Sequence, residues 1–438
     1  MLKISDNRRF LVNADGSPFF YLGDTAWSIF QRLDRDDVDQ YLQDRADKGF
    51  TVIQAVAISE LDGLRTPNRY GQLPLIDGDP TQPNEAYFRY MDEVLEKAAS
   101  LGLVVGLLPT WGDKVGPLRW GIGPLVFTPE NAAWYGEYLG VRYRDYPVLW
   151  ILGGDRNPDN EYRRSVWRSL AQGLKRGDQG RHLMTYHPMG VSSSSMFFPD
   201  EPWMDFNMLQ SGHFVWDRDN YNFLMHDYAF SPPKPCMDAE PDYEDMPVAL
   251  GAGYFGAYDV RKAAYWALFS GAFGHTYGAH GIWSFHDVDS PQPPNPIWKP
   301  LKTWREALQL PGAAQLQYAR WLLESRPFLS RIPDQSLLLS FSGTGTNYTC
   351  ATRSDDGSYA MIYTAGGCPF TVDLSKLSGT QCTGYWFDPR TGASRQIGSF
   401  SCQGSQQFTP PGTAVEPDWV LVLDDESQKF AAPGRTEN

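Results

Sequence analysis

Two short apolar runs of this chain each end on a carboxylic acid. Residues 147–155 read Pro-Val-Leu-Trp-Ile-Leu-Gly-Gly-Asp, and residues 234–240 read Lys-Pro-Cys-Met-Asp-Ala-Glu. Each run is typical of a buried strand. Cleavage of a glycosidic bond needs two carboxyl groups on rigid elements that face one sugar ring. One protonates the leaving oxygen, and the other attacks the anomeric carbon or activates water. We therefore predict Asp155 and Glu240 as a catalytic pair.

Each of the two acids also has an ordinary structural interpretation. Asp155 could cap a following helix, because Asn157, Pro158 and Asp159 come next, and Glu240 could be a solvated loop acid before Pro241. Both acids nevertheless stand at predicted strand ends, and in a barrel of parallel strands such ends meet at one mouth. The shared position favours the catalytic interpretation over the two structural ones.

Other acids compete for the same roles. Asp24 follows the first predicted strand in Leu-Gly-Asp-Thr-Ala-Trp, and we interpret it as a ligand of a sugar hydroxyl or as a residue that orients the site. Asp113 follows the third strand, while Glu60 and Asp287 end other segments. Asp238 lies two residues before Glu240, so strand alternation puts both on one side, and Asp238 could be the deeper acid of the pair.

Histidine and aromatic residues gather near the predicted strand ends. All seven histidines fall between residues 182 and 286, and we expect several to hydrogen-bond sugar hydroxyls or the two carboxylates. The predicted substrate contacts are Asp24, Trp27, Trp111, Asp113, Tyr186, His187, Gln210, His213, Trp216, Asp238, His280 and Trp283.

The motifs of several other enzyme classes are absent from the sequence. Neither His-x-His after the first strand nor His-Glu-x-x-His occurs, so we predict no metal site, although a metal-dependent barrel hydrolase stays open as an alternative. Gly-x-Ser-x-Gly and the phosphate-binding glycine loop are also missing, which argues against esterases and kinases. We expect no cofactor.

Composition narrows the possible partners. Aromatic residues make up 14% of the chain, which favours a carbohydrate partner because sugar rings present flat C–H faces that stack on aromatic side chains. A net charge of −14 without a basic stripe argues against nucleic acid. No apolar run reaches the roughly 18 residues of a membrane span, and the first residues lack the apolar core of a signal peptide. We expect a cytoplasmic protein, with a secreted or periplasmic one still possible if a signal has been removed.

From about residue 18 to 300, short apolar runs alternate with amphipathic stretches, the pattern of repeated βα units. Eight units predict a closed (β/α)₈ TIM barrel, a fold of the α/β class. The eight predicted strands are Phe19–Gly23, Val52–Ile58, Leu103–Pro109, Val148–Gly153, His182–His187, Phe206–Ser211, Pro235–Ala239 and His275–Ala279. Predicted helices begin at Asp34, Asn84 and Thr128, and another covers residues 259–271.

After about residue 335 the pattern changes to period-two strands, which predicts an antiparallel β-sandwich. The predicted division is a catalytic barrel over 1–334, a β-sandwich over 335–430 and a frayed tail over 431–438. The strands expected in the second domain are Ser336–Phe341, Asn347–Thr352, Ser358–Thr364, Phe370–Asp373, Gly384–Phe387 and Trp419–Leu423. Four cysteines of this region could form two disulfides or remain free thiols.

Four ordered motifs resemble the apiosidase-like catalytic domain of glycoside hydrolase family 140. They are Tyr21-Leu-Gly-Asp-Thr-Ala-Trp27, Leu149-Trp-Ile-Leu-Gly-Gly-Asp-Arg-Asn157, Asp238-Ala-Glu240 and the stretch from Asp259-Val-Arg-Lys-Ala-Ala-Tyr-Trp266 to Gly271-Ala-Phe-Gly-His-Thr-Tyr-Gly278. The C-terminal region resembles the small β-domain, labelled collagen-binding, that accompanies this catalytic domain. The resemblance implies a barrel glycosidase with an Asp acid/base and a Glu nucleophile, which correspond to Asp155 and Glu240.

The family resemblance implies activity on apiose-linked side chains of a pectic polymer. From the sequence we therefore expect a retaining glycoside hydrolase acting on plant pectic or microbial oligosaccharides. A non-catalytic glycan-binding barrel is the alternative of a different class. The sequence does not decide the sugar, the linkage, endo or exo action, or the oligomeric state.

Overall fold

Eight parallel strands form a nearly closed barrel, which confirms the predicted fold class. The computed structural model describes residues 1–117, 123–249, 252–288, 300–412 and 416–434. The barrel strands are β4 (Tyr21–Thr25), β5 (Val52–Val56), β6 (Val104–Leu108), β7 (Val148–Gly153), β8 (Met184–His187), β10 (Asn207–Gln210), β11 (Cys236–Asp238) and β12 (Gly274–Tyr277). The last strand, β12, pairs in parallel with β4 and so joins the two ends of the series. All eight predicted strands are thus present.

Between β8 and β10 the ring is closed by hydrogen bonds outside the strand ladders. The backbone N–H of Asp205 donates to the Met184 carbonyl (2.9 Å), and the Thr185 hydroxyl donates to the Phe206 carbonyl (2.7 Å). The Asp205 carboxylate accepts from the Met184 N–H at 2.7 Å. A short strand, β9 (Ser192–Ser193), adds to the free side of β10 in the antiparallel sense.

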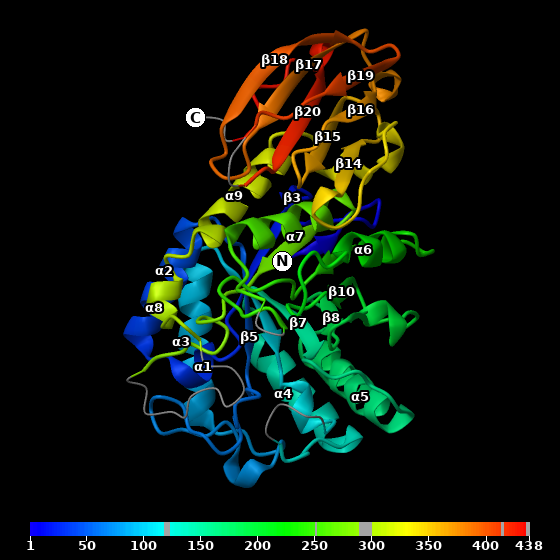
Figure 1. Cartoon of the computed structure of the whole chain (residues 1–438). Coiled ribbons are helices and arrows are strands. Elements are labelled where there is room, and N and C mark those ends of the chain that lie inside the picture. Colours follow the sequence, from blue (N-terminus) through cyan, green and yellow to red (C-terminus); the bar gives the residue numbers. More distant parts are fainter. Residues whose placement is uncertain (118–122, 250–251, 289–299, 413–415, 435–438) are drawn as a thin grey trace.

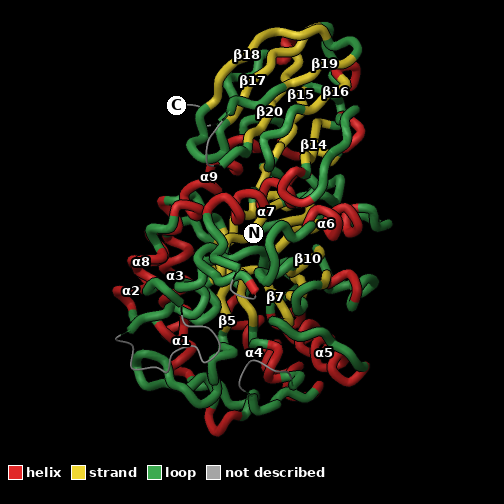
Figure 2. Tube along the Cα trace, viewed as in Figure 1, coloured by secondary structure: helices red, strands yellow, loops and turns green. Residues whose placement is uncertain are grey.

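Helices cover the outside of the barrel (Figure 1 and Figure 2). They are α1 (Ile29–Arg32), α2 (Arg35–Asp47), α3 (Glu85–Ser100), α4 (Pro129–Tyr143), α5 (Glu161–Gly177), α6 (Asn220–Tyr228), α7 (Ala257–Phe269), α8 (Trp304–Ala307) and α9 (Pro311–Glu324). The connection from β8 to β10 departs from the (β/α) rhythm, because residues 188–206, all of them described, hold β9 and a 3₁₀ turn in place of an α-helix. None of the helices in the described ranges combines the length and apolarity needed to cross a bilayer.

The predicted helix starts are confirmed by their caps. Asp34 and Asn84 accept from backbone N–H groups of α2 and α3, and Thr128 forms a capping box with Asn131. The helix predicted over 259–271 begins two residues earlier, at Ala257. The reason is that the Asp259 carboxylate accepts from the Gly256 N–H at 2.9 Å, which makes Asp259 a residue of the first turn and not the cap.

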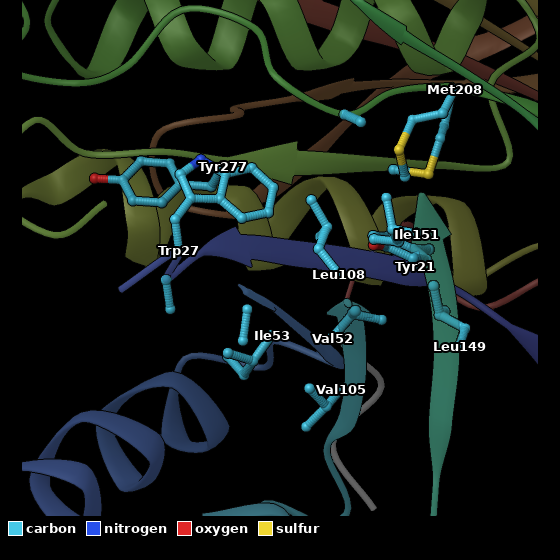
Figure 3. Close-up of a cluster of buried hydrophobic side chains, with 14 of the residues drawn as sticks. Tyr21, Trp27, Val52, Ile53, Val105, Leu108, Leu149, Ile151, Met208 and Tyr277 are labelled. Atoms are coloured by element: carbon cyan, nitrogen blue, oxygen red, sulfur yellow. The ribbon is translucent and has the colours of Figure 1, made fainter. Parts of the chain in front are cut away.

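The barrel interior is packed with side chains, as this fold requires. Figure 3 shows part of this cluster, in which Tyr21 and Ile151 lie together between strands. Gly106 of β6 makes room for them, since a Cβ there would lie 2.9 Å from Ile151 Cδ1. In this layer the Gln54 amide donates to the Thr276 hydroxyl at 2.8 Å, whereas the Tyr21 hydroxyl has no hydrogen-bond partner among the described residues. The packed layer forms the floor beneath the mouth of the barrel.

The C-terminal domain is an antiparallel, two-sheet β-structure, as predicted. Its larger sheet has the order β13-β14-β15-β20-β17-β18, and its smaller sheet pairs β16 with β19. Apolar residues of both sheets share one core. The strands are β13 (Arg331–Pro333), β14 (Thr349–Ser354), β15 (Tyr359–Thr364), β16 (Phe370–Asp373), β17 (Gln381–Phe387), β18 (Ser394–Ser401), β19 (Ser405–Phe408) and β20 (Trp419–Asp425).

The strand predicted over Ser336–Phe341 does not form. Asp334 instead caps a 3₁₀ turn over Gln335–Leu337, and Leu338 makes an isolated bridge to Val372. At the end of the chain, the Arg326 guanidinium donates to the Ala431 carbonyl at 2.9 Å, while 435–438, in the predicted frayed tail, lie outside the described residues. All five cysteines are free thiols.

The two domains share a buried interface next to α7 and α9 (Figure 1). Arg261 of α7 donates two hydrogen bonds to the Asp418 carboxylate, at 3.0 and 2.9 Å, and both side chains are fully buried. Tyr265 of α7 stacks on Tyr363 of β15 with ring centroids 4.7 Å apart. Near the end of α9, Arg326 donates two hydrogen bonds across the interface to the Asp424 carboxylate, with N–O distances of 2.8 and 2.6 Å. These contacts fix the sheet domain to the outside of the barrel.

Three short strands precede the barrel. The N-terminal sheet consists of β1 (Lys3–Ile4), β2 (Leu11–Val12) and β3 (Pro18–Phe19), which pair in sequence order. Phe10, next to β2, packs against Phe328 after α9, with ring centroids 4.9 Å apart. This sheet therefore lies away from the strand ends that carry the acids, and it serves to anchor the start of the chain.

Candidate active site

A pocket of about 160 Å³ opens at the C-terminal ends of the barrel strands. Every one of the eight barrel strands supplies at least one lining residue, at its tip or in the loop that follows it. The lining residues are Trp27, Glu60, Trp111, Asp155, Met189, Gly190, Gln210, His213, Phe214, Glu240, Tyr243, Met246 and Trp283. The two acids predicted as a catalytic pair, Asp155 and Glu240, therefore line the same pocket.

Asp155 reaches the pocket through a sharp turn after β7. Gly153 and Gly154 have φ values of +91° and +107°, and Asp155 itself has φ of 49°. Side chains are excluded at both glycines, because a Cβ on Gly153 would lie 2.3 Å from the His187 carbonyl oxygen and one on Gly154 would lie 2.6 Å from the Trp111 ring. The Gly-Gly-Asp sequence is therefore required to aim this carboxyl inward.

Neighbouring groups hold the turn after Asp155 in place. The Arg156 guanidinium donates to the carbonyls of Gly116 (3.0 Å) and Asp155 (2.7 Å). The Tyr186 hydroxyl donates to the Arg156 carbonyl at 2.5 Å. The hydrogen bonds of Arg156 and Tyr186 thus fix the backbone around Asp155. A left-handed conformation such as that of Asp155 persists where the surrounding structure holds it in place.

Glu240 lies just beyond the end of β11, across the pocket from Asp155, and is buried. Its Oε1 accepts from the Tyr243 hydroxyl at 2.7 Å, and its Oε2 lies 2.9 Å from His187 Nε2. The Tyr243 oxygen in turn accepts from Trp27 Nε1 at 3.1 Å. Both oxygens of Glu240 therefore face donors, which stabilises the ionised carboxylate.

The surroundings move the pKa values of the two acids in opposite directions. Burial and then the negative charge of Glu240 raise the pKa of Asp155 to about 7. Burial alone would also raise the pKa of Glu240, but pairing with His187 and the hydrogen bond from Tyr243 hold that pKa below its ordinary value. At neutral pH Asp155 can therefore carry a proton while Glu240 is charged. Two carboxyls whose pKa values differ in this way can serve as an acid and a nucleophile.

The two carboxyl groups lie close together. One oxygen of Asp155, one oxygen of Glu240 and one ring nitrogen of His187 all lie within 4.8 Å of one another. Such a set resembles three metal ligands, but His187 Nε2 and Glu240 Oε2 already face each other at 2.9 Å as an ion pair. Burial would lower the pKa of His187, whereas the Glu240 pairing outweighs this effect and raises that pKa, and a proton on the ring competes with metal binding.

Aromatic and amide side chains complete the wall. Trp27 and Trp111 contact each other with ring centroids 5.2 Å apart, and the His213 ring stacks on Tyr243 at 4.5 Å. The Gln210 amide hydrogen-bonds the Asp155 carboxyl. Trp111 Nε1 and Trp283 Nε1 are buried donors without a partner among the described residues. The pocket therefore offers apolar faces together with unused hydrogen-bonding groups, as a sugar site does.

Three acids predicted to contact substrate do not line the pocket. Asp24 is fully buried beneath it, where its Oδ2 lies 2.7 Å from both the Tyr41 hydroxyl and Arg45 Nε. Asp113 pairs with Lys114 at 2.6 Å. Asp238 accepts from the Ser211 hydroxyl at 2.6 Å and from the Asn220 amide at 3.0 Å, which ties β11 to the segment after β10 and to α6. Each acid stabilises the scaffold.

Four other predicted contacts lie outside the lining. Tyr186 and His187 lie directly behind it, bonded to Arg156 and Glu240 as described above. His280 is buried, with Nδ1 3.3 Å from the Asp245 carbonyl, and burial lowers its pKa to about 4. Trp216 is exposed and contacts Phe255 at 5.0 Å. The remaining predicted contacts, namely Trp27, Trp111, Gln210, His213 and Trp283, line the pocket.

Several lining residues were not predicted as substrate contacts. Glu60 is predicted only as a rival acid, and no residue pattern marks Tyr243, Phe214, Met189, Gly190 or Met246. Tyr243 stands three residues after Glu240, so its proximity to a predicted nucleophile was the signal that could have identified it. The others are brought to the mouth by loop conformations that no residue pattern specifies.

Two family models together match nearly the whole chain. The family model described as "Apiosidase-like, catalytic domain" matches residues 5–330, and the model described as "Putative collagen-binding domain of a collagenase" matches residues 332–424. A comparison with curated proteins gives no match.

Two solved structures are similar over nearly the full length. One, described as "Glycoside hydrolase", has a TM-score of 0.87 and 33% identity, and the alignment covers 97% of each chain. The other, a family 5 glycoside hydrolase from Bacteroides vulgatus, has a TM-score of 0.87 and 32% identity, covering 98% of this chain and 94% of that one. Similarity at this level extends through both domains.

Proposed function

Because the chain belongs to the apiosidase-like family of glycoside hydrolases, we propose that it cleaves glycosidic bonds with Asp155 as acid/base and Glu240 as nucleophile. The observation that supports this assignment most strongly is that the pKa values of two carboxyls in one pocket are shifted in opposite directions. The pKa of Asp155 is raised to about 7 and that of Glu240 is lowered. A proton donor and a charged nucleophile are the two parts that a retaining mechanism needs.

In the first step, the Glu240 carboxylate attacks the anomeric carbon and forms a covalent ester with the sugar. The bond to the leaving oxygen breaks, and that oxygen takes the proton of Asp155. In the second step, the Asp155 carboxylate removes a proton from water, the water oxygen attacks the anomeric carbon, and Glu240 leaves. His187 and Tyr243 support the charge of Glu240 at the start and end of this cycle.

The separation of the acids supports retention of configuration. One carboxyl oxygen of Asp155 and one of Glu240 lie within 4.8 Å of each other. Retaining enzymes hold their carboxyls about 5–5.5 Å apart, whereas inverting ones leave about 6.5–9.5 Å for a water molecule. The short separation favours direct attack by Glu240 over activation of water.

The size of the pocket supports binding of one sugar unit between the acids. A volume of about 160 Å³ is small beside the roughly 300–1,000 Å³ of typical ligand pockets. The aromatic walls formed by Trp27, Trp111 and Trp283 suit the C–H faces of such a unit. For the substrate we propose plant pectic oligosaccharides, including those that contain apiose, with microbial oligosaccharides as the second choice.

The test is product release from a panel of pectic and other plant oligosaccharides by the unaltered chain, Asp155→Asn and Glu240→Gln. Turnover by the unaltered chain and its loss in both variants, with folding retained, is the expected result. Glu93→Gln, which alters an exposed acid paired with Arg35, is the control that should keep full activity. NMR of the first product anomer should show retention, and an inverted product would overturn the role given to Glu240.

Two further readouts separate the alternatives. Tight glycan binding without turnover would favour a non-catalytic binding protein. Activity that is lost on chelation and restored by Zn²⁺ would favour a metal-dependent hydrolase built on Asp155, His187 and Glu240. The expected outcome is turnover that chelators leave unchanged.

A further inference from the structure

A third carboxyl group, that of Glu60, lines the pocket beside Asp155 and Glu240. The two-step mechanism gives it no role. Glu60 is only 8% exposed, yet its carboxyl has no hydrogen-bond or ion-pair partner among the residues that the structure describes. Burial of a polar group without a partner is unfavourable. A ligand that enters the pocket can supply a partner for this carboxyl.

The backbone around Glu60 is held rigidly. The neighbouring Ser59 carbonyl accepts from Lys114 Nζ at 3.1 Å, and the Ser59 hydroxyl lies 3.1 Å from that of Ser28. The Glu60 carbonyl accepts from the Asp62 N–H at 2.8 Å. Gly63 closes the turn so tightly that a Cβ there would lie 2.6 Å from Ser59 N. The backbone that carries the Glu60 side chain is therefore fixed at the pocket wall, and preorganised positions are the ones that confer specificity.

Arg156 lowers the pKa of Glu60, but its effect is smaller than those of burial and of the three neighbouring acids. Lys114 pairs with Asp113 at 2.6 Å. Burial, followed by the negative charges of Asp155, Asp113 and Glu240, raises the pKa of Glu60 well above its ordinary value. A protonated carboxyl has one O–H donor and a carbonyl acceptor. A sugar hydroxyl can satisfy both functions, because it also donates and accepts.

We infer that Glu60 binds a hydroxyl group of the sugar unit held between Asp155 and Glu240 and so determines which sugar the pocket accepts. The inference rests on the proposed glycosidase function and adds to it a residue that recognises the sugar. Its geometric basis is a rigid, buried and unpartnered carboxyl in the wall of a pocket with space for one unit. A pocket built to hydrogen-bond a hydroxyl discriminates strongly against an analogue that lacks it.

The experiment compares the unaltered chain with Glu60→Ala and Glu60→Gln on the active glycan and on deoxy analogues that each lack one hydroxyl of the cleaved sugar. Glu60→Ala should lower kcat/KM on the full substrate about 10- to 100-fold, because a buried hydrogen bond is lost. Glu60→Gln, which keeps a donor and an acceptor, should recover most of that loss. On one deoxy analogue the unaltered chain and Glu60→Ala should become equal, since the contact is absent from both.

Stability measurements separate recognition from a structural role. Glu60→Ala and Glu60→Gln should have a Tm no lower than that of the unaltered chain, because they remove an unpartnered buried acid. The matched control is Glu244→Gln: Glu244 is also buried, but it accepts from the Tyr277 hydroxyl at 2.7 Å and from the Gly312 N–H at 3.0 Å. That variant should lower Tm and leave the preference among deoxy analogues unchanged.

Three outcomes would overturn the inference. Unchanged kcat/KM in Glu60→Ala, or an equal loss on the full substrate and every deoxy analogue, would remove Glu60 from sugar recognition while the glycosidase function stands. A changed pH profile without a changed preference among analogues would make Glu60 a residue that acts through Asp155. Absence of turnover by the unaltered chain on any glycan would reject the proposed function itself and this inference with it.

Discussion

His187 Nε2 lies 2.9 Å from Glu240 Oε2, while Nδ1 of the same ring lies 3.0 Å from the Pro188 carbonyl oxygen. A histidine that faces a carbonyl with one nitrogen and a carboxylate with the other is held with both nitrogens protonated. The positive ring stabilises the charge of a buried Glu240. For the other acid, Asp155, burial and the negative charge of Glu240 raise the pKa to about 7.

Removing this positive charge should move the acid limb of the pH profile. His187→Leu eliminates the main group that lowers the pKa of Glu240, so that pKa rises and the carboxylate is lost at a higher pH. For each pH unit by which the pKa of Glu240 rises, kcat/KM should fall about tenfold at a fixed pH below the new pKa. Profiles of kcat/KM from pH 3 to 9 measure the displacement, with circular dichroism to confirm folding. An unmoved acid limb would show that His187 does not control Glu240.

The alkaline limb should report Asp155. This acid must be protonated to assist departure of the leaving group, and its pKa is about 7, so kcat/KM should fall tenfold for each pH unit above about 7. Asp155→Asn should abolish that limb and lower the rate about 10²- to 10⁴-fold on natural linkages. A glycoside with a highly acidic leaving group should lose far less. An alkaline limb that persists in Asp155→Asn would belong to another group.

Asp24 should prove important for stability and not for substrate binding. Its carboxylate is fully buried against Arg45, and Asp24→Ala leaves that buried guanidinium with only Asp44, 3.3 Å away, which costs about 3–5 kcal/mol. Urea unfolding measures the loss, and KM of the folded variant should be unchanged. Glu93→Gln breaks an exposed pair with Arg35 and should change the free energy of unfolding by less than about 1 kcal/mol. A higher KM with intact stability would restore Asp24 as a sugar ligand.

The barrel and the sheet domain should unfold together. Arg261 and Asp418 form a fully buried pair across the interface, and residues of both domains belong to one apolar cluster. Asp418→Ala should therefore destabilise the whole chain by about 3–5 kcal/mol and lower a single calorimetric transition. Two transitions, with only the weaker one displaced, would mean that the domains are independent.

The sequence predicts strand tips far better than it predicts side-chain surroundings. The run Val148–Gly153 coincides with β7, because a buried parallel strand is apolar throughout and ends at glycine. The same pattern places Asp155 and Glu240 at the barrel mouth. It cannot show that Asp24, also at a strand tip, turns toward Arg45 beneath the pocket, since that depends on how α2 packs on the barrel.

Loop geometry and exposed strands account for most of the remaining differences. Glu60 enters the pocket through a turn in which Asp62 has φ of 59° and Gly63 admits no side chain, and neither feature is evident from residue types. In the second domain, β18 was not predicted because Ser394–Ser401 is mostly polar and partly exposed, without the alternation that marks a half-buried strand. Conversely, Ser336–Phe341 has strand-like residues, but the Asp334 cap starts a 3₁₀ turn there.

All eight strands contribute to the pocket, and the two key acids lie in different halves of the ring. Asp155 follows β7, in the first four strands, whereas Glu240 follows β11, in the last four. A chain cut between α5 and β8 would therefore yield two fragments with only one of these two acids each, and neither fragment could turn over substrate. Activity would return only when the fragments reassemble, so glycosidase turnover would serve as a direct reporter of fragment complementation.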